Sequence, residues 1–109
     1  MNGIKSDHYV NSPMVMGVVN KIVELLGPQR IYLYNQRINS RNLISSFKLC
    51  IVTEVGDKFA AERDIYMEID CDVPFDILIY TPAEWEDLID SETSFARKIL
   101  DSGLVLYNG

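Results

Sequence analysis

The feature of the sequence that most constrains the fold is the run VPFDILIY over residues 73–80, in which Asp76 is the only charged residue. A short run of apolar, β-branched and aromatic residues predicts a strand, and its lack of polar alternation predicts burial on both faces. Thr81 and Pro82 follow directly and predict the start of a helix, because threonine caps helices and proline suits the first helical position. A buried strand that leads straight into a helix predicts a sheet with helices packed on it.

Strands and helices are also predicted along the rest of the chain, and the length of the whole chain suits one domain. We expect an α/β (α+β) fold with one mixed β-sheet, preceded by a polar N-terminal arm over residues 1–11 and formed by a single domain over residues 12–109. The expected elements are a helix over 13–26 after Ser12, strands over 31–34 and 47–55 joined by a polar loop over 35–46, a helix from Asp57 to about Asp70, a helix after Thr81, a helix capped by Thr93 that ends at Gly103, and an edge strand over 104–108.

Charge and cysteine content narrow the classes of partner. The formal net charge of −6 disfavours nucleic acid as a partner. Cys50 and Cys71 fit neither a metal-binding spacing nor a disulfide framework, which favours a reducing cytoplasm. The sequence contains no apolar run long enough to span a bilayer and no signal-peptide core, so we expect a cytoplasmic protein without a membrane partner. His8, the only histidine, is expected at the surface.

Four segments resemble, in order, the motifs of one family. Residues 31–34, the following Asn35-Gln36, the run SSFKLCIV and the run VPFDILIYTPAEWEDL stand where the nucleotidyltransferases of the DNA polymerase β type have a strand, a Gly-Ser loop, an Asp-x-Asp strand and a strand with a third aspartate. The ending SFARKILDSGLVLY is similar to the last helix and edge strand of the small bacterial members, the minimal nucleotidyltransferases. The resemblance covers roughly residues 13–107 and implies the nucleotidyltransferase fold.

The motifs that carry the family's chemistry are altered in this chain. Nucleotidyl transfer uses two Mg²⁺ ions about 3.5–4 Å apart, which are held by carboxylates. Asn35 and Gln36 replace Gly-Ser, and Ser46 and Lys48 replace the two aspartates, so that Asp76 alone remains. Serine is a weak neutral ligand and the lysine ammonium has no lone pair to offer. We therefore expect no catalytic residues and no cofactor, with Asp76 as the only candidate metal ligand.

Two other acidic arrangements do not restore the missing pair. No Asp-x-Asp or Asp-x-Glu occurs between residues 35 and 55, so a shifted alignment does not supply one. Asp70 and Asp72 have the required spacing, but they follow an expected helix, and we interpret them as a solvated helix end.

The remaining charged residues allow two interpretations each. If the fold is that of the family, Lys48 and Asp76 lie on neighbouring strands on one face, which predicts an ion pair; alternatively Lys48 extends into solvent and Asp76 accepts from a backbone amide. Arg37 matches an arginine that the family often has after Gly-Ser, so Arg37 and Lys48 could bind a nucleotide phosphate. The alternative is that Arg37 and Arg41 belong to a solvated basic loop.

Three functions are compatible with these residues. The first is a catalytically degenerate nucleotidyltransferase-like domain that acts by binding, and the resemblance implies a partner of the helical HEPN type, with this chain as antitoxin. The second is an active or weakly active enzyme that transfers a nucleotide with Mg²⁺ and ATP. The third is metal-independent nucleotide binding. Homo-oligomerisation is a further possibility.

Overall fold

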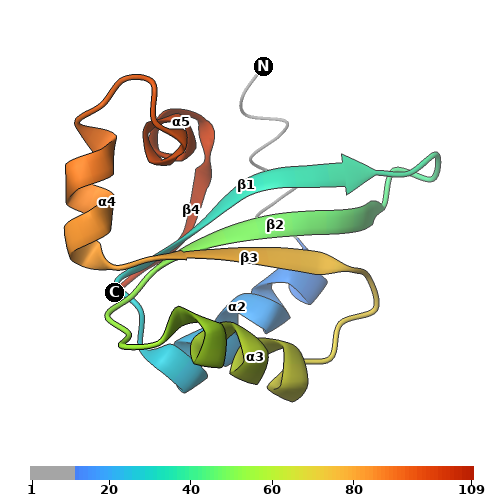
Figure 1. Cartoon of the computed structure of the whole chain (residues 1–109). Coiled ribbons are helices and arrows are strands. Elements are labelled where there is room, and N and C mark those ends of the chain that lie inside the picture. The colour runs from blue at the N-terminus through green and yellow to red at the C-terminus, as the bar shows by residue number, and fades with distance from the viewer. Residues whose placement is uncertain (1–11) are drawn as a thin grey trace.

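A four-stranded mixed sheet with helices on both faces forms the described part of the chain, residues 12–109 of the computed structural model (Figure 1). The expected α/β class with one mixed sheet is confirmed. The arm over residues 1–11, with His8, lies outside the described residues. The elements are α2 (Pro13–Leu26), β1 (Arg30–Ile38), β2 (Ile44–Val52), α3 (Lys58–Glu68), β3 (Phe75–Tyr80), α4 (Pro82–Ile89), α5 (Phe95–Ser102) and β4 (Leu104–Asn108).

The strands lie in the order β3-β2-β1-β4. β1 pairs antiparallel with both β2 and β4, whereas β2 pairs parallel with β3. The parallel pair requires a crossover connection, which α3 supplies. The register shifts between Leu33 and Asn35, so that Tyr34 is the extra residue of a β-bulge in β1.

Each face of the sheet is covered by a different pair of helices. α2 and α3 cover one face, and α4 and α5 cover one end of the other face (Figure 1). The first core includes Val15, Val18, Val19 and Ile22 of α2, whereas Leu25 of the same helix is 41% exposed. In the second core, Trp85 of α4 and Ile99 of α5 pack on Tyr32, Cys50 and Val52. None of the helices described is long and apolar enough to cross a membrane.

The prediction of a polar loop over residues 35–46 is wrong. β1 continues to Ile38 and β2 begins at Ile44, because these residues pair with one another in an antiparallel ladder. The turn occupies residues 39–43, where the side chain of Asn39 accepts from the backbone amides of Arg41 and Leu43. Asn42 adopts the left-handed conformation with φ of 64°, which asparagine tolerates better than most residues.

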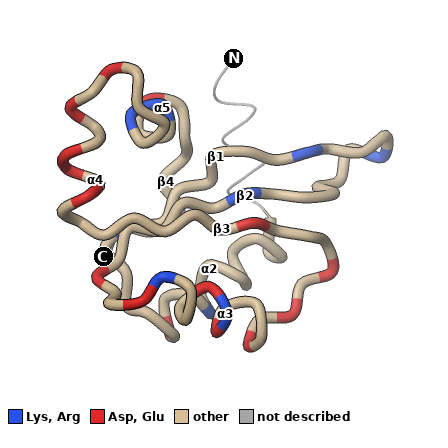
Figure 2. Tube along the Cα trace, viewed as in Figure 1, with Lys and Arg blue, Asp and Glu red and all other residues tan. Residues whose placement is uncertain are grey.

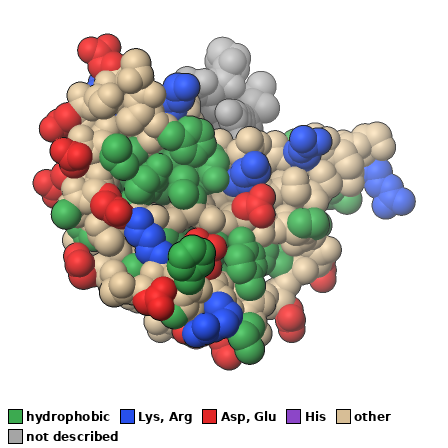
Figure 3. Space-filling view, in the orientation of Figure 1, with side chains coloured by type: hydrophobic (Ala, Val, Ile, Leu, Met, Phe, Trp, Pro, Cys, Tyr) green, Lys and Arg blue, Asp and Glu red, His purple; other side chains and the backbone are tan. Residues whose placement is uncertain are grey.

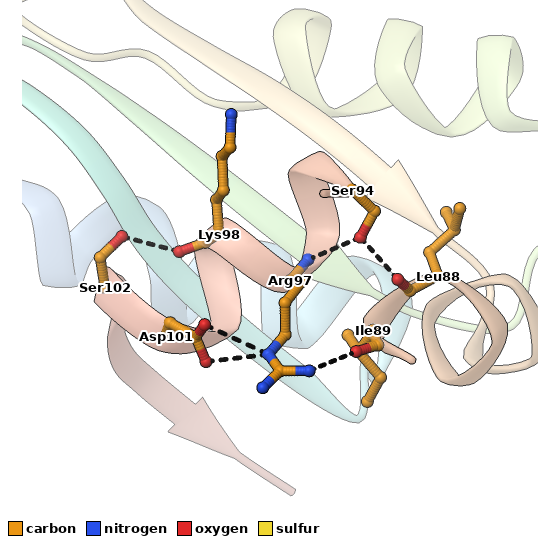
Figure 4. A network of polar contacts seen from close by, with 7 residues as sticks. All are labelled: Leu88, Ile89, Ser94, Arg97, Lys98, Asp101 and Ser102. Atoms are coloured by element: carbon orange, nitrogen blue, oxygen red, sulfur yellow. Dashed lines mark hydrogen bonds and ion pairs between the residues drawn. The ribbon is translucent and has the colours of Figure 1, made fainter. Parts of the chain in front are cut away.

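Four helix starts were expected from capping residues, and three are confirmed: Ser12, Asp57 and Thr81 each accept a backbone amide at the start of a helix. Thr93 is not the cap of α5. Ser94 accepts from the amide of Arg97 at 3.0 Å and its hydroxyl donates to the carbonyl of Leu88 at 2.5 Å (Figure 4). Among the described residues the hydroxyl of Thr93 forms a hydrogen bond only with Ser91, so the observed cap is the residue directly after the expected one.

The prediction that the strand over residues 73–80 is buried on both faces is also wrong. β3 is an edge strand, with Ile77 and Ile79 buried beneath α3 and Asp76 exposed on the opposite face. The apolar run therefore reflects one face buried under helices α2 and α3 and a second face that the second core partly covers at Leu78 and Tyr80 but not at Asp76.

Candidate functional site

Five of the six residues singled out from the sequence lie on one face of the sheet, beyond the end that α4 and α5 cover. Asn35 of β1 is paired with Lys48 of β2, and Lys48 is paired with Asp76 of β3, so the three form a row across three strands. Arg37 and Ser46 pair in the next row. Residues paired across adjacent strands project from the same face, and Figure 2 shows the basic residues of β1 and β2 beside an acidic residue of β3.

Gln36 is the sixth residue and does not belong to this face. It pairs with Phe47, whose side chain lies in the core under α2 and α3, so Gln36 projects toward that side of the sheet. Its Oε1 is buried and has no hydrogen-bond partner among the residues that the structure describes. Gln36 projects to that side because β1 continues as a strand here, and successive side chains of a strand lie on opposite faces. The side chain at the family's serine position therefore points away from the candidate site.

Lys48 and Asp76 are neighbours, but the expected ion pair between them is not formed. The ion pairs among residues 12–109 are Lys58–Glu84, Arg63–Asp64 and Arg97–Asp101. Lys48 and Asp76 are both exposed, and water around exposed groups weakens the attraction of such a pair. The interpretation in which Lys48 extends into solvent therefore fits this part of the structure better. Among residues 12–109 no backbone amide donates a hydrogen bond to the Asp76 carboxylate, so the second half of that interpretation is not seen there.

Tyr34 and Phe95 border the row, and the sequence analysis did not assign them to it. Their rings meet edge to face, with centroids 5.5 Å apart, and Phe95 is 51% exposed. Burial raises the pKa of Tyr34 to about 12, with smaller contributions from Cys50 and from the negative charge of Asp76. Tyr34 is therefore a neutral phenol that can donate a hydrogen bond at physiological pH. The bulge at Tyr34 places it here, and nothing in the sequence indicated the bulge.

The chemistry available on this face is that of a binding surface. Two cations, a hydroxyl, an amide, a phenol and one carboxylate share this face, and hydrophobic side chains gather beside these charges in Figure 3. No group of three or more metal-ligating side chains occurs in the part of the chain that the structure describes. Of Ser46, Lys48 and Asp76 only Asp76 carries a carboxylate, so these residues do not fit a pair of Mg²⁺ ions.

Asp70 and Asp72 lie outside this row, in the loop between α3 and β3. They line an open hollow of about 480 Å³ between the end of α3 and the start of β3, together with Cys71. Both carboxylates are exposed, as expected for a solvated helix end. Cys50 is buried and its thiol is free.

Comparison of this chain with protein-family models, curated proteins and solved structures finds no match in any of the three. The described residues form a mixed α/β protein with one four-stranded sheet and helices packed on it.

Proposed function

We propose that this chain is a nucleotidyltransferase-like domain that has lost two-metal catalysis and acts by binding a protein partner. The observation that carries the proposal is the row Asn35–Lys48–Asp76, in which a lysine lies directly beside the single remaining acid. In the fold proposed, the second metal-binding aspartate of the strand would stand at Lys48. A lysine ammonium in that position repels a nearby divalent cation and offers it no lone pair.

The partner that the resemblance implies is a helical protein of the HEPN type, to which this chain would act as antitoxin. The row and its border of Tyr34 and Phe95 combine charged groups with exposed aromatic surface, which is the composition of many protein-binding patches. Co-purification of the full chain from its native host tests this directly. Recovery of a stable helical partner supports the proposal, and recovery of none argues against it.

A transfer assay separates the binding function from the enzymatic alternative. The chain is incubated with labelled nucleoside triphosphates and Mg²⁺ or Mn²⁺, and incorporation of label into protein or small-molecule acceptors is measured. We expect none, because the carboxylates that stabilise the transition state are missing. Incorporation that the Asp76→Ala variant abolishes would contradict the proposal and identify an active enzyme.

A second candidate function is metal-independent nucleotide binding, which is favoured by two exposed cations in adjacent rows of one face. Arg37 and Lys48 could contact phosphates without a metal ion. Calorimetry with ATP in the presence of EDTA tests this function. Binding that survives chelation, and that the Lys48→Ala variant weakens at least tenfold while Lys98→Ala does not, would establish it. Lys98 is a suitable control because it is an exposed lysine on α5.

A further inference from the structure

The hairpin formed by β1 and β2 extends beyond both of the strands that flank it (Figure 1). β4 pairs with β1 only as far as Leu33, and β3 pairs with β2 only from Phe47 onward. Residues 34–38 of β1 therefore have no strand on their outer side within the described part of the chain. An open strand edge of this kind can pair with an added strand.

The backbone of this segment directs hydrogen-bonding groups toward its open side. The carbonyl of Arg37 accepts from the Ser45 hydroxyl, and the amide of Asn39 donates across the turn, so both groups face the side of β2. Backbone groups of successive residues in a strand point to alternate sides. The amides and carbonyls of Gln36 and Ile38 therefore face the open side.

The edge of the sheet formed by β3 is covered by side chains instead. The amide of Ile77 donates to the hydroxyl of Tyr66, and the amide of Thr81 at the end of β3 donates to Glu84. Proteins commonly cover strand edges, because unpaired amides and carbonyls invite pairing with another chain. Among residues 12–109, no side chain makes such a contact with the backbone of residues 36 and 38, so this part of β1 remains open.

The hairpin is a basic segment of an acidic chain. Residues 30–52 contain Arg30, Arg37, Arg41 and Lys48 and no acidic residue, although the whole chain has sixteen acids and a net charge of −6. Arg37 and Arg41 are exposed, and neither forms an ion pair with the residues that the structure describes. Their charges are thus available to a negatively charged ligand at the outer end of the hairpin (Figure 2).

The two sides of the open segment differ in chemistry. Arg37 pairs with Ser46 and projects from the face of the row, whereas Ile38 pairs with Ile44, whose side chain lies in the first core. Ile38 is 40% exposed, so it presents apolar surface on the side of α2 and α3. Successive side chains of an added strand would lie on these two sides in turn. The open segment therefore suits a ligand strand in which acidic and apolar residues alternate.

We propose that residues 34–38 of β1 bind an extended acidic segment of the protein partner, which adds to the sheet in line with β4. Its acidic side chains lie beside Arg37 and Arg41, and its apolar side chains lie beside Ile38. The proposal rests on the function proposed above, because it names the chemistry of that partner. RNA would also supply negative charge, but the net charge of −6 opposes its approach, and its phosphates cannot pair with a strand edge as a peptide backbone does.

Titration of the full chain with short synthetic peptides tests the proposal. The probe is the capped peptide Glu-Val-Glu-Val-Glu-Val-Glu, and its control has lysine in place of every glutamate. Chemical shifts of the backbone amides are followed by NMR. We expect the acidic peptide to bind at least tenfold more tightly than its control and to shift the amides of residues 34–38. Equal binding of the two peptides, no binding at millimolar concentration, or shifts centred on β4 would overturn the proposal.

Two further probes separate strand pairing from a general attraction between charges. N-methylation of two successive central residues of the acidic peptide keeps its charge and removes one amide donor from each edge of the peptide. Binding should then weaken at least tenfold, and unchanged binding would overturn strand addition. A short single-stranded RNA of similar charge should bind more weakly than the acidic peptide, and tighter binding of the RNA would overturn the proposed class of partner.

Charge-reversal variants test the assigned side chains. Arg37→Glu/Arg41→Glu should reverse the preference, so that the lysine peptide binds more tightly than the acidic peptide. Lys21→Glu/Lys98→Glu should leave the preference unchanged. Lys21 and Lys98 are exposed lysines on α2 and α5, so this control carries the same change of charge. Equal effects of the two double variants would overturn the proposal.

The same variants distinguish failure at this edge from failure of the proposed function. A partner that co-purifies from the native host and binds the Arg37→Glu/Arg41→Glu variant as tightly as the natural chain would overturn the edge proposal and leave the proposed function intact. Binding of the acidic peptide at residues 34–38, with no partner recovered from the native host, would contradict the proposed function and support the edge as a peptide-binding site.

Discussion

Ser94 joins two helices through one hydroxyl group, and its removal should be measurable. The hydroxyl accepts from the amide of Arg97 as the N-cap of α5 and donates to the carbonyl of Leu88 at the end of α4. Loss of an N-cap costs about 1 kcal/mol. Loss of the bond to Leu88 costs roughly 0.5–1 kcal/mol, since amides of residues 90 and 91 still donate to that carbonyl.

Ser94→Ala should therefore reduce the free energy of unfolding by about 1.5–2 kcal/mol. For a domain of this size that corresponds to a Tm roughly 6–15 °C lower, which circular dichroism at 222 nm or urea titration can measure. Ser94→Asp keeps the acceptor and loses the donor, so it should recover about half of the loss.

Thr93→Ala is the matched control, because its hydroxyl contacts only the exposed Ser91. We expect a change within about 0.5 kcal/mol for this variant. Equal destabilisation by the two alanine variants, or a larger effect of Thr93→Ala, would refute the assignment of the cap.

Two further results are expected from groups in or beside the second core. Burial raises the pKa of the Cys50 thiol from 9.0 to about 12, so at pH 8 its thiolate population is about a thousandfold below that of an ordinary thiol. Titration with Ellman's reagent should show one fast thiol, which Cys71→Ser removes, and a second only on unfolding; two fast thiols would contradict the buried position of Cys50. The pKa of Tyr34 is also raised, to about 12, and a group whose folded pKa exceeds its unfolded pKa stabilises the fold below the unfolded value. Stability should therefore fall as the pH rises from about 9 to about 12, and a urea midpoint that is constant over that range would show that neither pKa is raised.

The elements with local signals could be predicted from the sequence. α2 follows from its cap at Ser12, its apolar periodicity and Gly27, and α4 follows from Thr81 and Pro82. These signals lie within a few residues of each element, and their physical basis is the satisfaction of backbone groups at helix ends.

The arrangement of the candidate site could not be predicted, because the features that form it have no local signal in the sequence. The polar residues 35–37 favoured the prediction of a loop because polar side chains are rare in buried strands, yet here the strand is partly exposed and is held by its pairing with β2. The bulge at Tyr34 then decides which side chains share the face of Lys48, and it is a property of the pairing of two strands rather than of either one alone. Prediction of the row of Asn35, Lys48 and Asp76 would therefore have required both the pairing register and the order of the strands in the sheet.

The most direct test of the account is to return the two missing carboxylates and measure metal binding. Mn²⁺ is titrated into the Ser46→Asp/Lys48→Asp variant, and paramagnetic broadening of backbone amide resonances is followed by NMR. Lys21→Asp/Ser40→Asp carries the same change of charge on α2 and the β1–β2 turn and serves as the control. If residues 46, 48 and 76 mark a metal site that has lost two of its carboxylates, submillimolar Mn²⁺ will broaden the amide resonances around these residues in the first variant. The same resonances will stay sharp in the natural chain and in the control. Equal broadening in all three, or none in the restored variant, would contradict it.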